Sequence, residues 1–388
     1  PEDWRTVYTV NHVGFVARQN IETREYTFIT PTPETISNFS EYVEYDYDET
    51  RNKYTIDPGE HWFFRERPDR PLLPPQFRFN WSSPFIISSN NSKRVFFGSN
   101  HLFKSDDRGD NWEIISPDLT TNDKSLRNTS DGGGLTNSNT GGENHFTIIT
   151  ISDTPIDKDV IWVGTDDGNV QVTIDNGDTW DNVRPNIVGV PQKTWVSRVE
   201  ASKHKKGRAY VSFDNHRFDD NKPYVFMTDD YGKSWKNITS DLPKDYSVYV
   251  IKEDYIDENL LFVGTEKSVY FTINQGKIWE KLGSNLPSVA IHDLVIHPRD
   301  GDLIAGTHGK SIWILDDISP LRNLNFNSNK IIPSRESTKW IKINTGRKQP
   351  YFEFRGENPP YGAIINFYSK TEIKGKITIT NSSGSNLY

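Results

Sequence analysis

Residues 105–112 read Ser-Asp-Asp-Arg-Gly-Asp-Asn-Trp, and three similar octapeptides follow at residues 173–180, 228–235 and 272–279. All four have Ser or Thr first, Asp or Asn third, Gly fifth and Trp eighth. A fixed motif that returns at uneven intervals indicates one structural unit with connections of variable length.

The physical chemistry of the octapeptide is that of a hairpin turn. The third-position side chain can accept hydrogen bonds from backbone N–H groups, and the first-position hydroxyl can add another. Glycine at the fifth position allows a backbone conformation that other residues resist, and the tryptophan can pack at the start of the next strand. We therefore predict a structural role, without catalytic chemistry, for Asp107, Gly109, Trp112, Asp175, Gly177, Trp180, Asp230, Gly232, Trp235, Asn274, Gly276 and Trp279.

The segments around each octapeptide repeat as well. An alternating strand (A) precedes a strand that ends in Gly-Thr or a similar pair (B), a third strand (C) runs into the octapeptide, and a short strand (D) follows. Four antiparallel strands in repeat are typical of a propeller blade. The sequence thus predicts an all-β protein, a β-propeller with five blades in residues 78–320, at about 78–118, 143–186, 195–240, 247–282 and 290–317.

The remaining segments are expected to differ from these blades. Residues 1–32 resemble strands B, C and D of a partial blade, so we expect the chain to begin inside a larger propeller. Residues 33–77 form an acidic connection that becomes Pro-rich, and residues 117–144 form a long Gly-containing connection. Residues 338–388 resemble the start of a β-sandwich-like domain, with strands at 362–368 and 376–380.

Composition excludes several classes of function. The net charge of −8 disfavours nucleic acid as a partner, and the absence of cysteine excludes disulfides, thiolate metal sites and cysteine nucleophiles. The sequence contains no run of 18 apolar residues, the length needed to span a membrane. Its first residues do not resemble a signal peptide. No metal-ligand spacing and no cofactor motif is present, so we predict neither a metal site nor a cofactor.

The octapeptides match the Asp-box (BNR) repeat of sialidases, xyloglucanases, photosystem II assembly factors and sortilin receptors. The wider sequence resembles large exported bacterial proteins described as BNR-repeat glycosyl hydrolases or as sortilin-like. This resemblance is carried by residues 116–120, 163–173, 195–200, 291–300, 306–317 and 355–363. It implies a secreted, cell-surface or periplasmic propeller that binds polypeptide ligands, although the chain lacks the cysteines of the module that staples eukaryotic sortilins.

Candidate binding residues follow from propeller topology. The B–C and D–A connections lie on one face of a propeller, here called the B–C face, and the Asp boxes lie on the other. Polar and aromatic residues of this face, or of the nearby starts of inner strands, predict a binding site for a polypeptide or a glycan. These residues are Asp166, Asp167, Trp195, Arg198, His216, Arg217, Phe218, Asp219, Glu266, His292, Asp293, His308 and Lys310.

Two alternatives remain open at the level of sequence. The acidic pairs are also ordinary turn residues, Arg198 and Asp293 could form an ion pair between blades, and His292 could be a core histidine. A glycoside hydrolase would need two carboxyl groups facing each other across a cleft. Asp166 or Asp167 could form such a pair with Asp219 or Asp293, but no sequence motif selects them.

Overall fold

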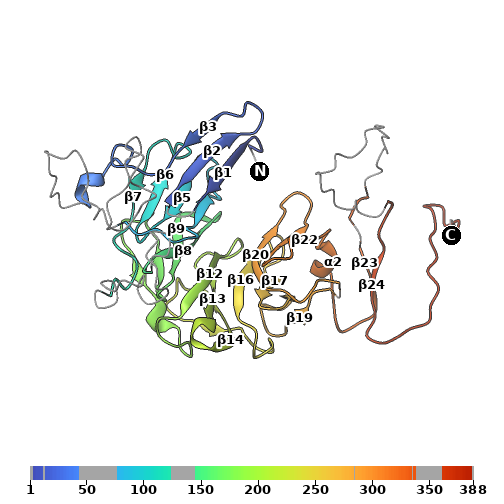
Figure 1. Ribbon diagram of the computed structural model, residues 1–388. Coiled ribbons are helices and arrows are strands. Elements are labelled where there is room, and N and C mark those ends of the chain that lie inside the picture. Colours follow the sequence, from blue (N-terminus) through green and yellow to red (C-terminus); the bar gives the residue numbers. More distant parts are fainter. Residues whose placement is uncertain are drawn as a thin grey trace. The chain divides into compact units, whose positions relative to one another are not determined.

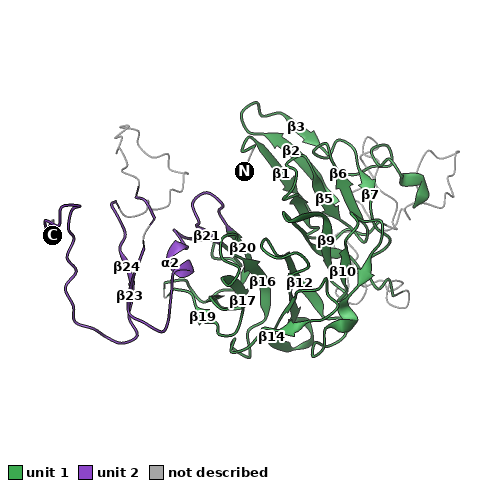
Figure 2. Cartoon of the chain, turned by 180° about the vertical axis from the view of Figure 1, so that it is seen from behind, with its two compact units in different colours: residues 1–295, 305–313 green, residues 296–304, 314–388 purple. Residues whose placement is uncertain are grey.

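The computed structural model describes residues 3–11, 14–42, 77–123, 145–283, 285–333, 335–337 and 361–386. Most of the connection at 33–77, of the connection at 117–144, and residues 338–360 lie outside this range. The chain divides into two compact units (Figure 2), one with residues 1–295 and 305–313 and the other with residues 296–304 and 314–388.

The first unit consists of small antiparallel sheets that follow one another along the chain (Figure 1). Four of them are four-stranded, with strands in the order A, B, C and D. They are β4 (Phe85–Ile87), β5 (Val95–Gly98), β6 (Leu102–Ser105) and β7 (Glu113–Ile114); β8 (Ile148–Thr154), β9 (Asp157–Thr165), β10 (Val170–Thr173) and β11 (Asp181–Asn182); β12 (Trp195–Ala201), β13 (Ala209–Asn215), β14 (Asp220–Thr228) and β15 (Lys236–Asn237); and β16 (Val248–Glu253), β17 (Leu261–Thr265), β18 (Val269–Thr272) and β19 (Glu280–Lys281).

Two three-stranded sheets complete the series. The first contains β1 (Thr6–Val10), β2 (Val16–Asn20) and β3 (Tyr26–Phe28), and the last contains β20 (Ile291–Ile296), β21 (Leu303–Thr307) and β22 (Ile312–Leu315). Strand β12 contacts both β8 and β16, so the A strands of successive blades are neighbours. The predicted propeller of antiparallel blades is therefore confirmed.

Each Asp box connects a C strand to the following D strand, and its internal hydrogen bonds are those expected of the turn. In the box at 173–180, the main-chain N–H of Thr179 donates to Asp175 over 2.9 Å. The hydroxyl of Thr173 accepts from the N–H of Gly177 over 2.9 Å and donates to Asp175 over 2.7 Å. These hydrogen bonds, with the Thr179 hydroxyl foremost, hold the pKa of Asp175 at about 2.

The boxes also join successive blades, a role that the sequence pattern does not predict. The indole N–H of Trp180 donates over 2.9 Å to the carbonyl of Ile115, the residue after strand D of the preceding blade. Trp112 and Trp279 make the corresponding bonds to Ile29 and Ile238, also over 2.9 Å. Trp235 departs from this pattern, because its indole donates to Gly232 in its own box.

The bond from Trp112 also identifies the strands of the first sheet. Ile29 follows β3 as Ile115 follows β7, and both residues accept a hydrogen bond from the next box tryptophan. Strand β3 therefore occupies the position of a D strand, which makes β2 and β1 the equivalents of strands C and B.

Hydrophobic cores lie between consecutive blades rather than inside each one. Between the β8–β11 and β12–β15 blades, for example, Trp162 and Val172 lie in one buried cluster with Val199 and Phe213. Because a thin four-stranded sheet buries its faces only against neighbouring sheets, the stack of blades is the stable unit.

The second unit contains helix α2 (Ser319–Arg322) and a two-stranded sheet of β23 (Lys330–Ile332) and β24 (Asn366–Tyr368). Strand β24 lies within the strand predicted at 362–368. The strand predicted at 376–380 is wrong, because only Thr380 of this segment pairs, through an isolated bridge to Asn386. Alternation of Ile and Thr gives strand propensity, but a strand also needs a partner to satisfy its backbone.

We expect Asp175→Ala and Asp230→Ala each to lower the free energy of unfolding by about 1 kcal/mol, the usual net value of a hydrogen bond. The value is modest because the bonds that Thr179 and Ser234 donate to these carboxylates are solvent-exposed. Urea denaturation of both variants measures the change. A loss of ligand binding at unchanged stability would contradict the structural role of the box.

Candidate functional site

One position of the repeat supplies polar side chains to the B–C face in consecutive blades. In three blades, the residue after strand B donates its main-chain N–H to the residue before strand A, and this bond marks the equivalent positions. The bonds run from Asp166 to Thr147 over 3.1 Å, from Glu266 to Ser247 over 3.0 Å, and from His308 to Ala290 over 2.9 Å. In the β12–β15 blade, Asp214 is paired with Trp195 at the same place.

The inner strands β8, β12 and β16 each contain a bulge, and this bulge supplies a second side chain. The register of β16 shifts between Val248 and Val250, which leaves Tyr249 as the extra residue. His292 stands two residues after Ala290, as Tyr249 stands two after Ser247, so the two rings occupy equivalent positions. Bulges re-aim side chains and are common beside functional sites.

Side chains at or beside these positions form a row of rings from three blades, here called the ring row: His216, Tyr249, His292 and His308. The Tyr249 and His292 rings are stacked, with centroids 4.6 Å apart and planes 10° apart. The centroid of His308 lies 5.3 Å from that of His292, and the His216 ring meets Tyr249 edge-on at 6.2 Å. Both outer histidines are exposed, so the row is open to solvent at its ends.

Burial and neighbouring groups shift the pKa values of Tyr249 and His292. The Tyr249 hydroxyl donates a hydrogen bond to Glu266, and burial together with this bond raises the pKa of Tyr249. Burial lowers the pKa of His292, and the neighbouring His308 lowers it further. At neutral pH, Tyr249 is therefore a neutral donor and His292 a neutral ring.

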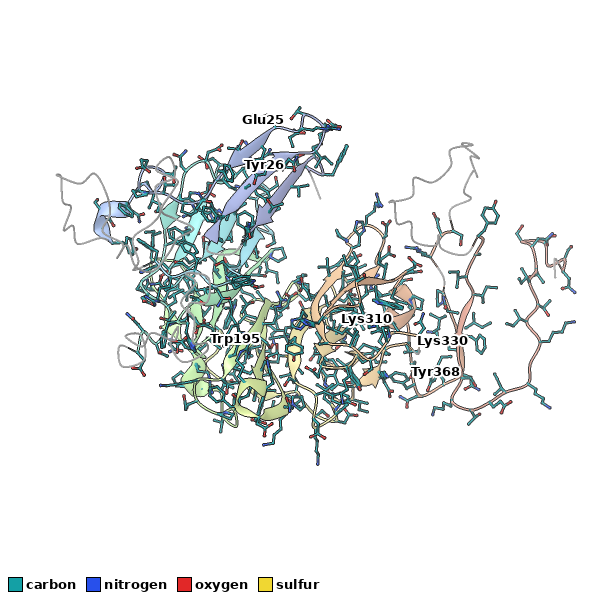
Figure 3. The ribbon with its side chains drawn as sticks, viewed as in Figure 1. Glu25, Tyr26, Trp195, Lys310, Lys330 and Tyr368 are labelled. Carbon is teal, nitrogen blue, oxygen red and sulfur yellow. The ribbon has the colours of Figure 1, made fainter. Side chains whose placement is uncertain are left out.

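A second group adjoins the ring row at the start of β12, where Figure 3 labels Trp195. The guanidinium of Arg217 lies over the Trp195 ring, 4.0 Å from its centroid, and also contacts Asp214 over 3.3 Å. Asp214 accepts a 2.7 Å hydrogen bond from His216. His216 and Arg217 begin the 3-10 helix η4 (His216–Phe218). Next come Phe218, which is 70% exposed, and the cap residue Asp219, which is exposed with a φ of 58°.

Arg198 and Asp293 form the ion pair that the sequence suggested, with 2.8 Å between guanidinium nitrogen and carboxylate oxygen. Arg198 also donates to the His292 carbonyl over 3.4 Å, so it links β12 to β20 past the intervening blade. Trp195, Arg198, His216, Arg217, His292, Asp293 and His308 are thus brought together on one face.

Asp166 and Asp167 lie apart from this exposed group. Each is only 2% exposed, and the protein itself supplies their hydrogen-bond donors. Asp166 accepts from the N–H and hydroxyl of Thr147 over 2.8 and 2.7 Å, and Asp167 accepts from Thr165 and from the N–H of Thr121. This arrangement matches their interpretation as turn residues, and we leave them out of the proposed site.

Burial and the charge of Asp167 raise the pKa of Asp166 to about 8. A carboxyl group with a folded-state pKa above its unfolded value of about 4 binds its proton in the folded state across that interval. Stability is therefore expected to fall as pH rises from about 4 to 8, and Asp166→Asn is expected to remove that slope. Urea unfolding at pH 5 and pH 8 measures it, with the exposed Asp219→Asn as the matched control. An unchanged slope in Asp166→Asn would contradict the raised pKa.

Sequence reasoning missed two residues of the site, Asp214 and Tyr249. Asp214 could have been found by aligning Asp166, Glu266 and His308 as residues that follow strand B. The sequence pattern around Tyr249 predicts an ordinary alternating strand. No sequence signal predicts the bulge that turns the Tyr249 side chain toward His292.

Within the described ranges, no group of three His, Asp, Glu or Cys side chains is placed to hold a metal ion. No helix in the part of the chain that the structure describes is long and apolar enough to cross a membrane.

The fold and the site define a β-propeller with Asp-box blades and a polar, aromatic B–C face. Residues 223–376 match the family model described as sortilin, neurotensin receptor 3, which confirms the resemblance to sortilin-like propellers. No curated protein sequence matches the chain.

Solved structures of several kinds are similar to this chain. A chain of the COPII coat assembled on membranes matches with a TM-score of 0.50 and 10% identity, over 81% of this chain and 38% of that one. The GH74 enzyme of Niastella koreensis matches with a TM-score of 0.48 and 14% identity, over 82% of this chain and 44% of its own. The GH74 xyloglucanase of Xanthomonas campestris matches with a TM-score of 0.44 and 17% identity, over 59% of this chain and 36% of the xyloglucanase. This chain spans less than half the length of each, and at these identities the likeness concerns the fold alone.

Proposed function

We propose that this chain is an exported sortilin-like propeller that binds a polypeptide on its B–C face. The observation that carries the proposal is the meeting of the ring row with the Arg217–Trp195 stack, from three blades, at an exposed surface. Binding energy at protein interfaces concentrates in aromatic and arginine side chains on rigid scaffolds. The match to the sortilin family supports both the export and the class of ligand.

The stacking within the site favours a polypeptide over a glycan. A sugar ring packs its C–H groups against the open face of an aromatic ring. Here Tyr249 and His292 cover each other, and Arg217 covers one face of Trp195. What remains accessible is ring edges, hydrogen-bonding nitrogens and the Phe218 side chain, which suit peptide groups and apolar side chains.

The carboxyl groups argue against the glycoside hydrolase alternative. Such an enzyme needs one carboxyl group as acid and another as base or nucleophile, facing the substrate. Asp166 and Asp167 are buried, and Asp293 is paired with Arg198. Of the four carboxyl groups considered for this role, only Asp219 is both exposed and without an ion-pair partner among the described residues.

Binding arrays test the proposal. The purified chain is applied to an array of 12-residue peptides of varied sequence and to an array that includes xyloglucan oligosaccharides and sialosides. We expect saturable binding to a subset of peptides, with no turnover of any glycan. Glycan hydrolysis that disappears in Asp219→Asn or Asp293→Asn would replace the binding function with the enzymatic one.

A further inference from the structure

Asp214 is a buried carboxylate whose hydrogen bonds go to two consecutive residues of the proposed site. Its side chain is 3% exposed. One oxygen accepts from the main-chain N–H of His216 over 3.1 Å, and both oxygens lie 2.7 Å from the Nδ1 atom of that ring. The second oxygen also accepts from Arg217 over 3.3 Å. A buried carboxylate is costly unless it is compensated, so these contacts hold both side chains in place.

The contact with His216 determines where its ring proton sits. A carboxylate only accepts hydrogen bonds, so the Nδ1 atom of a neutral His216 must carry the proton. The other ring nitrogen, Nε2, then keeps its lone pair. No residue that the structure describes bonds to Nε2, and the His216 side chain is 40% exposed. A ligand therefore meets an acceptor at this position.

The contact with Arg217 determines where its donors point. The guanidinium carbon lies over Trp195, 4.0 Å from the ring centroid, and the Nη1 group donates to Asp214. A guanidinium has five N–H donors in a fixed plane. Among the described residues, only Asp214 accepts a hydrogen bond from this guanidinium, and it does so from Nη1. The remaining donors project from a preorganised cation beside His216, its neighbour in sequence.

We propose that Asp214 is the positioning residue of the B–C face, and that it makes His216 and Arg217 an acceptor–donor pair that reads a main-chain peptide unit. This proposal deepens the polypeptide-binding function and rests on it. An extended segment offers an N–H to the Nε2 atom of His216 and a carbonyl to the guanidinium of Arg217. Preorganisation of both groups reduces the ordering cost of binding.

Two variants separate the two contacts of Asp214. Asp214→Asn keeps one carbonyl oxygen for His216 but places an amide NH₂ where Arg217 needs an acceptor, so it should release Arg217 alone. Asp214→Ala should release both side chains. Lys222→Ala serves as the matched control, because Lys222 lies nearby in strand β14 with a 71% exposed side chain and pairs with Asp220 rather than with Asp214, His216 or Arg217.

Nuclear magnetic resonance of the full chain tests the positioning without any ligand. At pH 8, ¹⁵N shifts of the imidazole should show His216 protonated at Nδ1 in the wild type and in Asp214→Asn. Asp214→Ala should move the proton to Nε2. The Nε–Hε order parameter of Arg217 should fall in both variants, and this readout remains if Asp214→Ala does not fold. Wild-type protonation at Nε2, or an unchanged Arg217 in Asp214→Asn, overturns the proposal.

The best-binding array peptide tests the reading of a peptide unit. Asp214→Asn should weaken its binding at least about tenfold, which corresponds to about 1.4 kcal/mol. A scan of singly N-methylated peptides should find one position whose methylation weakens wild-type binding but has little effect in His216→Ala. Absence of any such position overturns the peptide-reading role. If no peptide binds while the wild-type and variant spectra behave as expected, polypeptide binding is wrong and the positioning by Asp214 stands.

Discussion

Gly177→Ala is expected to lower the free energy of unfolding by roughly 3 kcal/mol or more, the sum of backbone strain and overpacking. Gly177 has a φ of +106°, which residues with a Cβ atom rarely adopt. A Cβ atom there would also lie 2.5 Å from the carbonyl oxygen of Ile115, in the preceding blade. That oxygen accepts the Trp180 indole hydrogen bond, so the added methyl group would force apart the contact that joins the two blades.

Urea denaturation measures the effect, and Gly189→Ala is the matched control. Gly189 has a φ of +91° but open space around the position of a Cβ atom, so its substitution carries the backbone strain without the clash. The difference between the two variants isolates the contact between blades. Equal losses of stability in Gly177→Ala and Gly189→Ala would show that this contact contributes nothing measurable.

The sequence predicts the turn of each Asp box because its hydrogen bonds are local. Asp175, Gly177 and Thr173 stand within five residues of one another, and the same spacing returns in every box. The bond from Trp180 to Ile115 crosses 65 residues, and its acceptor is a carbonyl that any residue type supplies. A main-chain acceptor leaves no signature in the sequence, which is why the joining of blades was not predicted.

The candidate site was likewise predicted only in part from the sequence. Topology alone places Trp195, Arg217 and His308 on one face, because connections alternate between the faces of a propeller. It does not distinguish a buried carboxylate from a partly exposed one at the same repeat position, as Asp166 and Glu266 illustrate. That difference depends on local partners: Thr147 holds Asp166 inside, whereas Glu266 accepts its bond from the bulge residue Tyr249.

Simultaneous replacement of Arg217 and Phe218 by Ala is expected to weaken binding of the best array peptide by at least about 30-fold, the loss that defines an interface hot spot. Phe218 is 70% exposed and Arg217 stacks on Trp195, so the pair presents an apolar side chain beside a preorganised cation. Folding should be preserved, because both residues lie in a surface connection outside the cores between blades. Isothermal titration calorimetry with the wild type and the variant measures the change.

Arg217→Lys separates charge from geometry in this prediction. A lysine keeps the positive charge but lacks the planar fork that covers Trp195 and reaches Asp214. We therefore expect Arg217→Lys to bind nearly as weakly as Arg217→Ala. Lys222→Ala, in the adjoining strand β14 and with a 71% exposed side chain, should bind as the wild type does. If Arg217→Lys retains full affinity, the ligand responds to charge alone, and the stacked guanidinium is not what the polypeptide recognises.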